Sequence, residues 1–307
     1  MVATKLLVGA VIPKQYGLIT IFVKTFRIDW HLMYFRAMLK SVKATPILII
    51  LLLMFQGCSK YQKILKSTDY EKKFEMAKVY YDAGKFQKAF PLLEELMTVY
   101  RGTSKGESVY YYYAYCQYAL GDYLLASFHF GNFAKTFGRS EHAEESMFMG
   151  AKCYFLDSSD PSLDQESTYK AIQEIQLFIN KYPKSEKVAE CNDLMDRLRF
   201  KLETKDYNMA KLYFNMEDYK ASTTALRNVL NDYPETRYGE EMSYMIVSSA
   251  YLLAVNSIEK KKEDRYNKAL EECRAFTEKF PENSYRKDID NIFATSNKAL
   301  EKMANAN

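Results

Sequence analysis

The sequence repeats one apolar pattern five times, and this pattern limits the folds that the chain can adopt. Each copy has a small residue, an apolar residue four positions later and another three positions beyond that, and the small residues are Ala89, Ala126, Ala171, Ser222 and Ala269. Positions i, i+4 and i+7 lie on one face of a helix, so each copy predicts an amphipathic α-helix. Three copies end in an aromatic residue followed by a helix-stopping proline: Pro183, Pro234 and Pro281.

A second helix is predicted before each of the first four copies. The small residues at the expected helix crossings are Ala77, Ala114, Ala151 and Ala210. Helix pairs joined by short turns (82–85 and 120–122) resemble the tetratricopeptide repeat, in which one pair cannot bury its apolar face without neighbouring pairs. The resemblance implies an all-α fold, a right-handed superhelix of about five repeats over 68–307. Only 11 Gly and 7 Pro in 307 residues also disfavour an all-β chain, which needs frequent turns.

The copies are spaced 37, 45, 51 and 47 residues apart, which exceeds the repeat length of about 34. We expect the surplus in a loop at 157–165 and in a solvated helix extension at 259–265, where a docking surface is the alternative. The tyrosine-rich run 110–115 has high β-propensity, but the repeat pattern on both sides predicts a helix.

The N-terminal sequence predicts a secretion signal over 38–57. Residues 38–43 are basic, 47–55 are apolar, and Gly57-Cys58 follows. A basic start, a short apolar core and a small residue before the cleavage site are typical of a secretory signal peptide. The apolar run is about half of the roughly 20 residues that a membrane-spanning helix needs.

This signal ends like a bacterial lipoprotein signal, in which the cysteine becomes the first residue of the mature chain. The resemblance implies a covalent diacylglycerol and an N-acyl chain on Cys58, which anchor a protein stably. Residues 58–67 would then be the lipidated cysteine and its tether. Ser59 stands where an Asp would resemble an inner-membrane retention signal, so it favours the outer membrane. A cleaved signal with a free cysteine nearby is the alternative.

Residues 1–37 precede a complete signal and show no periodic apolar face. The simplest account is that translation begins at Met38 and that 1–37 are a mis-called extension; a genuine cytoplasmic or membrane-inserted leader is the alternative. Residues 1–57 hold seven Lys or Arg and one Asp, which leaves 36 basic and 38 acidic residues after them. This near-neutral remainder gives no electrostatic case for binding nucleic acid.

The most specific part of the sequence is the insertion in the third copy. It contains Leu163-Asp164-Gln165, and the copy continues with Thr168 and ends in Phe-Ile-Asn-Lys-Tyr-Pro at 178–183. Five repeats behind a lipid-modified cysteine, together with this insertion, resemble the BamD (YfiO) family of outer-membrane protein assembly lipoproteins over about 58–295.

The resemblance implies a periplasm-facing scaffold of the β-barrel assembly machinery, without catalytic activity. It also implies partners: unfolded outer-membrane protein precursors at the first repeats, and the barrel-forming subunit, with its periplasmic repeat domains, at the last ones. Other lipoproteins are further candidate partners. A lipoprotein adaptor for cell-wall, division or sugar-uptake machinery shares the lipid signal and the helices, and is the alternative.

The first helix of each pair lines the concave face of such an array and predicts a groove for a partner. Its positions there are Phe74, Lys78, Tyr81, Tyr111, Tyr115, Tyr118, Phe148, Lys152, Phe155, Tyr207, Lys211 and Phe214. Rings offer contact area and lysines offer charge, which suits an extended peptide that ends in an aromatic residue and a carboxylate. The alternative is that most of these rings pack between helices.

The remaining residue types give no catalytic, metal or cofactor site, and the sequence predicts a protein that is not an enzyme. There are only three histidines, no glycine-rich phosphate loop and no Cys-x-x-Cys pair. Cys116 and Cys153 occupy equivalent positions in neighbouring repeats, where helices pack roughly 8–10 Å apart. That distance exceeds the reach of a disulfide, about 7 Å between Cα atoms. We therefore expect buried free thiols at these two cysteines and at Cys191 and Cys273.

Overall fold

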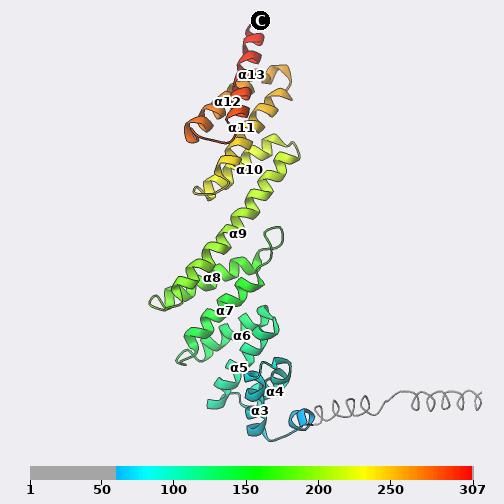
Figure 1. The fold of residues 1–307 in the computed structure, drawn as a ribbon, viewed down its shortest axis with the longest axis vertical. Coiled ribbons are helices and arrows are strands. Elements are labelled where there is room, and N and C mark those ends of the chain that lie inside the picture. Colours follow the sequence, from blue (N-terminus) through cyan, green and yellow to red (C-terminus); the bar gives the residue numbers. More distant parts are fainter. Residues whose placement is uncertain (1–59, 306–307) are drawn as a thin grey trace, which may run out of the picture. The chain divides into compact units, whose positions relative to one another are not determined.

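Residues 60–305 are described by the computed structural model, and all the regular structure among them is helical (Figure 1). The predicted extension at 1–37, the signal peptide at 38–57 and Cys58 lie outside the described residues. The labelled helices are α3 (Tyr70–Asp82), α4 (Phe86–Val99), α5 (Ser104–Leu120), α6 (Tyr123–Thr136), α7 (Ala143–Asp157), α8 (Glu166–Lys181), α9 (Val188–Asn215), α10 (Tyr219–Asp232), α11 (Gly239–Val255), α12 (Glu259–Lys279) and α13 (Arg286–Ala304).

The chain divides into two compact units, 1–76 and 77–307. In the described part of the first unit, a short helical segment at 60–65 precedes the start of α3. Lys73 Nζ donates a hydrogen bond to the Leu65 carbonyl at 3.1 Å. In the second unit each helix from α4 onward packs on the next one in the chain, up to α13. This pattern of neighbour contacts is that of stacked helix pairs.

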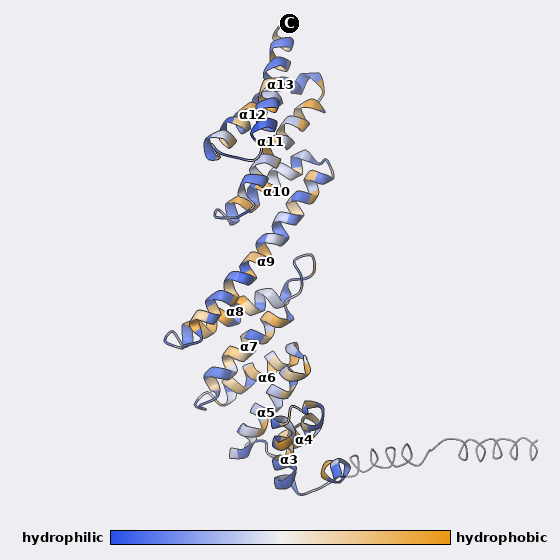
Figure 2. Cartoon of the chain, in the orientation of Figure 1, coloured by the Kyte–Doolittle hydropathy of each residue, from blue (hydrophilic) through white to orange (hydrophobic). Residues whose placement is uncertain are grey.

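The repeated small–apolar–apolar pattern forms the core between the helices, as the sequence predicts. Ala126, Phe130 and Phe133 are fully buried along one face of α6, and Ile175 and Phe178 are fully buried on α8. In Figure 2 apolar and polar residues alternate along the helices, as the helical period requires. Burying one side chain of this size stabilises the fold by about 1.5–3 kcal/mol.

The first helix of the second pair ends at a glycine in the left-handed conformation. Gly121 has φ +86°, and its N–H donates to the carbonyls of Gln117 and Tyr118 at the end of α5. Gly84, after α3, has φ +68°. Glycine adopts this conformation without the steric cost that a Cβ brings, so these turns fall where the sequence places them.

Two helices differ from the simple repeat. α9 is one continuous helix of 28 residues. Its first half buries Cys191 and Leu198 in the core that includes α8, whereas Tyr207 and Ala210 in its second half belong to the core that includes α10. α13 follows the fifth copy and contributes Ile289 to the last core cluster. The sequence pattern identified neither the first half of α9 nor α13.

The other expectations about the repeats are confirmed. The tyrosine-rich run lies within α5, a loop at 158–165 joins α7 to α8, and the charged segment at 259–265 is the exposed start of α12. All four cysteines of the described residues are buried free thiols. Burial raises the pKa of the Cys116 and Cys153 thiols to about 12, which keeps them protonated.

Candidate partner-binding surface on the first helices

Half-buried tyrosines follow one side of α5 and continue onto α3. The Tyr111 and Tyr115 ring centroids lie 4.8 Å apart, and Tyr115 and Tyr118 lie 6.4 Å apart. On α3 the Tyr81 ring lies edge-on to Tyr112 of α5 at 4.9 Å, and Lys78, whose side chain is exposed, holds its Nζ 5.7 Å from the centre of that same ring. We call Lys78, Tyr81, Tyr111, Tyr115 and Tyr118 the aromatic surface.

One carboxylate holds two of these tyrosines in place. The Tyr115 hydroxyl donates to Oε1 of Glu145 at 2.6 Å, and the Tyr111 hydroxyl donates to Oε2 at 2.8 Å. Burial, reinforced by the hydrogen bond to Glu145, raises the pKa of both tyrosines above their usual range. Both hydroxyls therefore remain protonated donors at neutral pH. His142, at the start of α7, stacks on Tyr111 with ring centroids 4.2 Å apart.

The predicted groove lysines of the third and fourth repeats are paired with carboxylates of the chain itself. Lys152 Nζ lies 2.8 Å from Glu190, and Lys211 Nζ lies 2.8 Å from Glu241. Lys211 also donates to the Tyr207 hydroxyl at 2.9 Å. Each of these two lysines therefore has a carboxylate partner within the chain, and that they supply charge to a peptide stays a prediction.

These contacts share one rule. In each case a polar side chain on the first helix of one pair bonds to an acidic residue at the start of the first helix of the next pair. These acidic residues are Glu145 of α7, Glu190 of α9, Glu241 of α11 and Asp288 of α13. Asp288 accepts from the Tyr244 hydroxyl at 3.5 Å. An acidic residue is also favourable at a helix N-terminus because of the helix dipole. These acids are not among the predicted site residues, although their recurrence at the start of every second helix is the signal that identifies them.

Two of the predicted groove rings belong to the core. Phe148 is only 3% exposed and packs on Phe178, and Tyr207 is 6% exposed and stacks on Tyr238 with ring centroids 4.0 Å apart. A partner cannot reach either ring, so their assignment to the groove is wrong and the alternative of packing between helices holds.

The other predicted positions are half-buried. Phe155 lies under the Arg197 guanidinium, 4.6 Å from its centre, and Phe214 meets Tyr219 edge-on at 6.4 Å. Phe74 is half-buried in the first compact unit. The half-buried rings of α3 and α5 thus form one group of neighbouring tyrosines, whereas Phe155 and Phe214 stand on α7 and α9.

No group of three or more His, Cys, Asp or Glu side chains within 60–305 is placed to hold a metal ion. His129 packs edge-on against the rings of Tyr110 and Tyr113, and burial lowers its pKa. His129 is therefore a neutral packing residue at physiological pH. That the chain is not an enzyme stays a prediction.

The insertion between α7 and α8 is an ordered loop built around one buried amide. Gln165 is 3% exposed; its Nε2 donates to the carbonyls of Asp160 at 2.7 Å and Leu163 at 3.1 Å, and its Oε1 accepts from Thr168 at 2.6 Å. Lys205 of α9 donates to the Leu163 carbonyl at 2.6 Å. The Leu-Asp-Gln sequence thus fixes the loop from within and against the long helix.

Helix pairs stacked in this way form a tetratricopeptide-type repeat scaffold, a fold class that presents extended surfaces to other proteins. The model of the YfiO family, described as "Outer membrane lipoprotein", matches residues 67–264. The chain belongs to this family. Among the described residues, no helix is both long and apolar enough to cross a membrane.

Tetratricopeptide domains are among the solved structures that are similar to the chain. The TPR2AB domain of yeast Sti1, in a structure titled as its complex with pHSP90, is 13% identical with a TM-score of 0.35 and covers 74% of this chain and 98% of its own. The TPR domain of P58(IPK) is 12% identical with a TM-score of 0.36 and covers 79% of this chain and 68% of its own. No curated protein matches the chain.

Proposed function

We propose that this protein is a scaffold of the β-barrel assembly machinery, anchored in the outer membrane by lipid on Cys58 and facing the periplasm. It binds unfolded outer-membrane protein precursors and the barrel-forming subunit, and so promotes folding and insertion of the precursors. The observation that carries this proposal is the family match over 67–264, which includes both the aromatic surface of α5 and the Gln165 loop.

The aromatic surface supports the part of the proposal that concerns precursors. Tyrosine rings give a large contact area at low cost in side-chain entropy, and they accept varied apolar side chains. Lys78 lies beside the rings of this surface, with its Nζ 5.7 Å from the centre of the Tyr112 ring. A peptide that ends in an aromatic residue and a carboxylate would place its ring among the tyrosines and its charge near Lys78.

Affinity purification from solubilised outer membrane tests the proposed machinery. We expect the tagged protein to recover a β-barrel protein with periplasmic repeat domains, and mass spectrometry of the mature N-terminus to show a lipidated Cys58. Recovery of a cell-wall synthase or a sugar transporter in its place would contradict the proposal. An unmodified N-terminus upstream of Cys58 would contradict the lipid anchor.

Peptide binding tests the aromatic surface separately. Tyr118→Leu removes a ring that lies 6.4 Å from Tyr115 and 5.8 Å from Tyr123. We expect this change to weaken binding of a peptide ending in phenylalanine by about 1 kcal/mol, roughly the contribution of one aromatic contact. Tyr213→Leu on α9, where the tyrosine is 41% exposed, is the matched control. Equal weakening by both changes would contradict the assignment.

A further inference from the structure

Two grooves occur at equivalent places in the repeat array. One lies between α6 and α8 with α7 as its floor and has a volume of about 670 Å³; the other lies between α10 and α12 with α11 as its floor and has a volume of about 320 Å³. The repeat pattern aligns α6 with α10 through Ala126 and Ser222, and it aligns α8 with α12 through Ala171 and Ala269. The two grooves can therefore be compared position by position.

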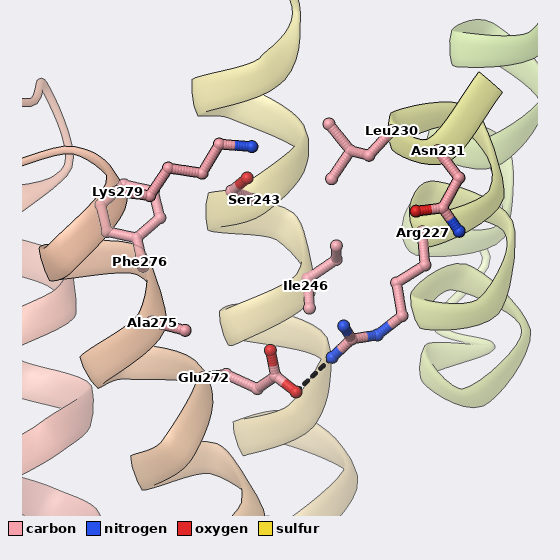
Figure 3. Close-up of a pocket in the computed structure, with 9 residues that line it drawn as sticks. All are labelled: Arg227, Leu230, Asn231, Ser243, Ile246, Glu272, Ala275, Phe276 and Lys279. Carbon is pink, nitrogen blue, oxygen red and sulfur yellow. Dashed lines mark hydrogen bonds and ion pairs between the residues drawn. The ribbon is translucent and has the colours of Figure 1, made fainter. Parts of the chain in front are cut away.

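An ion pair spans the α10–α12 groove and narrows it. Arg227, five residues after Ser222, reaches from α10 across α11 to Glu272, three residues after Ala269 on α12 (Figure 3). Both charged groups lie in the groove among Ile246 and other lining residues. This bridge occupies the space between the two helices and ties them together.

The α6–α8 groove has the acid of this bridge but not the arginine. Glu174, three residues after Ala171, is the equivalent of Glu272, whereas the position of Arg227 is taken by Gly131. A Cβ at Gly131 would meet no atom within 4 Å. The absence of a side chain at Gly131 thus leaves open the space that Arg227 takes in the other groove.

Both walls of the open groove carry an exposed apolar side chain. Phe128 of α6 is 58% exposed and Leu177 of α8 is 45% exposed, and both line the groove. Leu124 and Leu125 continue the apolar surface along α6. Gly150 on the floor has no side chain, and a Cβ there would lie 3.5 Å from the Ser127 carbonyl oxygen and the Gly131 nitrogen, so this glycine lets α6 and α7 approach closely. Large apolar side chains gathered on a surface are typical of interaction sites.

One end of the groove carries two unbalanced positive charges. Lys135 and Lys181 line the groove and stand in the last turns of α6 and α8. Within residues 60–305 neither lysine forms an ion pair; Lys181 Nζ lies 5.3 Å over the Tyr182 ring. In this respect they differ from Lys152 and Lys211, whose carboxylate partners belong to the chain.

We propose that the α6–α8 groove is a docking site for an amphipathic helix of another protein, with acidic residues in its first turn. Its apolar face would lie between Phe128 and Leu177, and its acidic first turn would meet Lys135 and Lys181. This orientation is antiparallel to α6 and α8, so helix dipoles and charges agree. α7 resembles the proposed partner helix, because it packs between α6 and α8 and has acidic residues, Glu144 and Glu145, in its first turn. The site goes beyond the proposed function and does not depend on it.

The probe is a labelled 15-residue helical peptide with leucines at i, i+3, i+4 and i+7 and glutamates in its first turn. Fluorescence anisotropy with the full mature protein measures its affinity. Gly131→Arg introduces the arginine of the α10–α12 groove opposite Glu174, and we expect it to weaken binding about tenfold or more, the effect of about 1.4 kcal/mol. Gly131→Ala leaves the groove open and Arg227→Gly alters only the other groove, so both should bind like the wild type. Thermal melts of each variant establish that it is folded.

Charge reversal tests the orientation. Lys135→Glu with Lys181→Glu should weaken the acidic peptide and strengthen a peptide with lysines in its first turn. The proposal is overturned if Gly131→Arg binds as well as Gly131→Ala, or if a scrambled peptide with its leucines spread around the helix binds equally. It is also overturned if Gly131→Arg abolishes dimerisation of the protein or its binding to phospholipid vesicles. Those results would assign the groove to a second copy or to a membrane.

Discussion

The hydroxyl of Tyr115 on α5 donates a 2.6 Å hydrogen bond to Glu145 in the first turn of α7. Tyr111, one turn earlier on α5, donates to the other oxygen of the same carboxylate at 2.8 Å. Two first helices of neighbouring repeats are thus joined by one carboxylate rather than by packing alone. This contact fixes the rings of the aromatic surface, and it predicts how single changes there should behave.

Tyr115→Phe should lower the free energy of unfolding by about 1 kcal/mol, because it removes a hydrogen bond to a charged group in a partly exposed site. The ring stays in place against Phe130, whose centroid is 4.9 Å away, so the packing is kept. Urea denaturation measures the change. Tyr213→Phe on α9 is the control, and the interpretation fails if both variants lose the same stability.

The ion pair between Lys211 and Glu241 should make stability depend on pH at both extremes. Burial alone would raise the pKa of Glu241, but hydrogen bonds from Lys211 and Tyr207 outweigh it and hold that pKa below its ordinary value of 4.5. The hydrogen bond to Glu241 raises the pKa of Lys211 above its ordinary value of 10.5. The lowered pKa of Glu241 stabilises the fold above about pH 4.5, and this stabilisation is lost as the pH falls through the pKa of Glu241 in the folded protein. The raised pKa of Lys211 stabilises the fold below about pH 10.5, and this stabilisation is lost as the pH rises through the pKa of Lys211 in the folded protein.

Glu241→Gln removes the acid-side dependence while it keeps an acceptor for Lys211. We expect the melting temperature of the wild type to exceed that of the variant near pH 7 and the difference to shrink below pH 4, where the carboxylate gains a proton. Calorimetric melts between pH 3 and pH 8 measure it. A difference that stays constant over this range would mean that the pair contributes no pH-dependent stability.

The repeat frame could be read from the sequence because each second helix must bury the same three positions. Phe130 and Phe178 are fully buried where the pattern places them. The first half of α9 could not be read in this way, since Cys191 and Leu198 face a neighbouring helix in a different register from Ala210. A pattern derived from a single helix pair does not identify a long helix that contributes to two core clusters.

The partner surface was harder to predict because exposure depends on neighbouring repeats. Phe148 and Tyr111 occupy equivalent helix positions, three residues before Ala151 and Ala114, yet Phe148 is covered by Phe178 whereas Tyr111 is half-buried. The same holds for charged residues. The sequence of α7 alone suggests that Lys152 is unpaired, but Glu190 at the start of α9 forms an ion pair with it. The spacing of residues along one helix predicts which side of the helix a residue lies on. Only the contacts between helices show whether another residue covers that side.

Gln165→Ala should loosen the 158–165 loop and destabilise the protein by about 2 kcal/mol, because two backbone carbonyls and the Thr168 hydroxyl lose a buried partner. Hydrogen exchange should become faster at residues 160–165 than in the wild type. Gln173→Ala on the exposed side of α8 is the matched control and should change neither quantity. If exchange in the loop is unaffected by Gln165→Ala, the amide network does not hold the loop.

Glu217→Gly should stabilise the protein. Glu217 follows α9 with φ +63°, and it stands five residues before Ser222, the place that Gly84 and Gly121 take before their own small residues. A non-glycine residue in the left-handed conformation destabilises the fold by about 1–2 kcal/mol, and glycine removes this strain. Glycine also raises the entropy of the unfolded chain, which offsets part of the stabilisation. The net gain should be about 0.5–1 kcal/mol in urea denaturation. Glu217→Ala removes the same carboxylate but keeps the Cβ, so it should give no such gain; equal effects of alanine and glycine would show that the backbone conformation at this turn stores no strain.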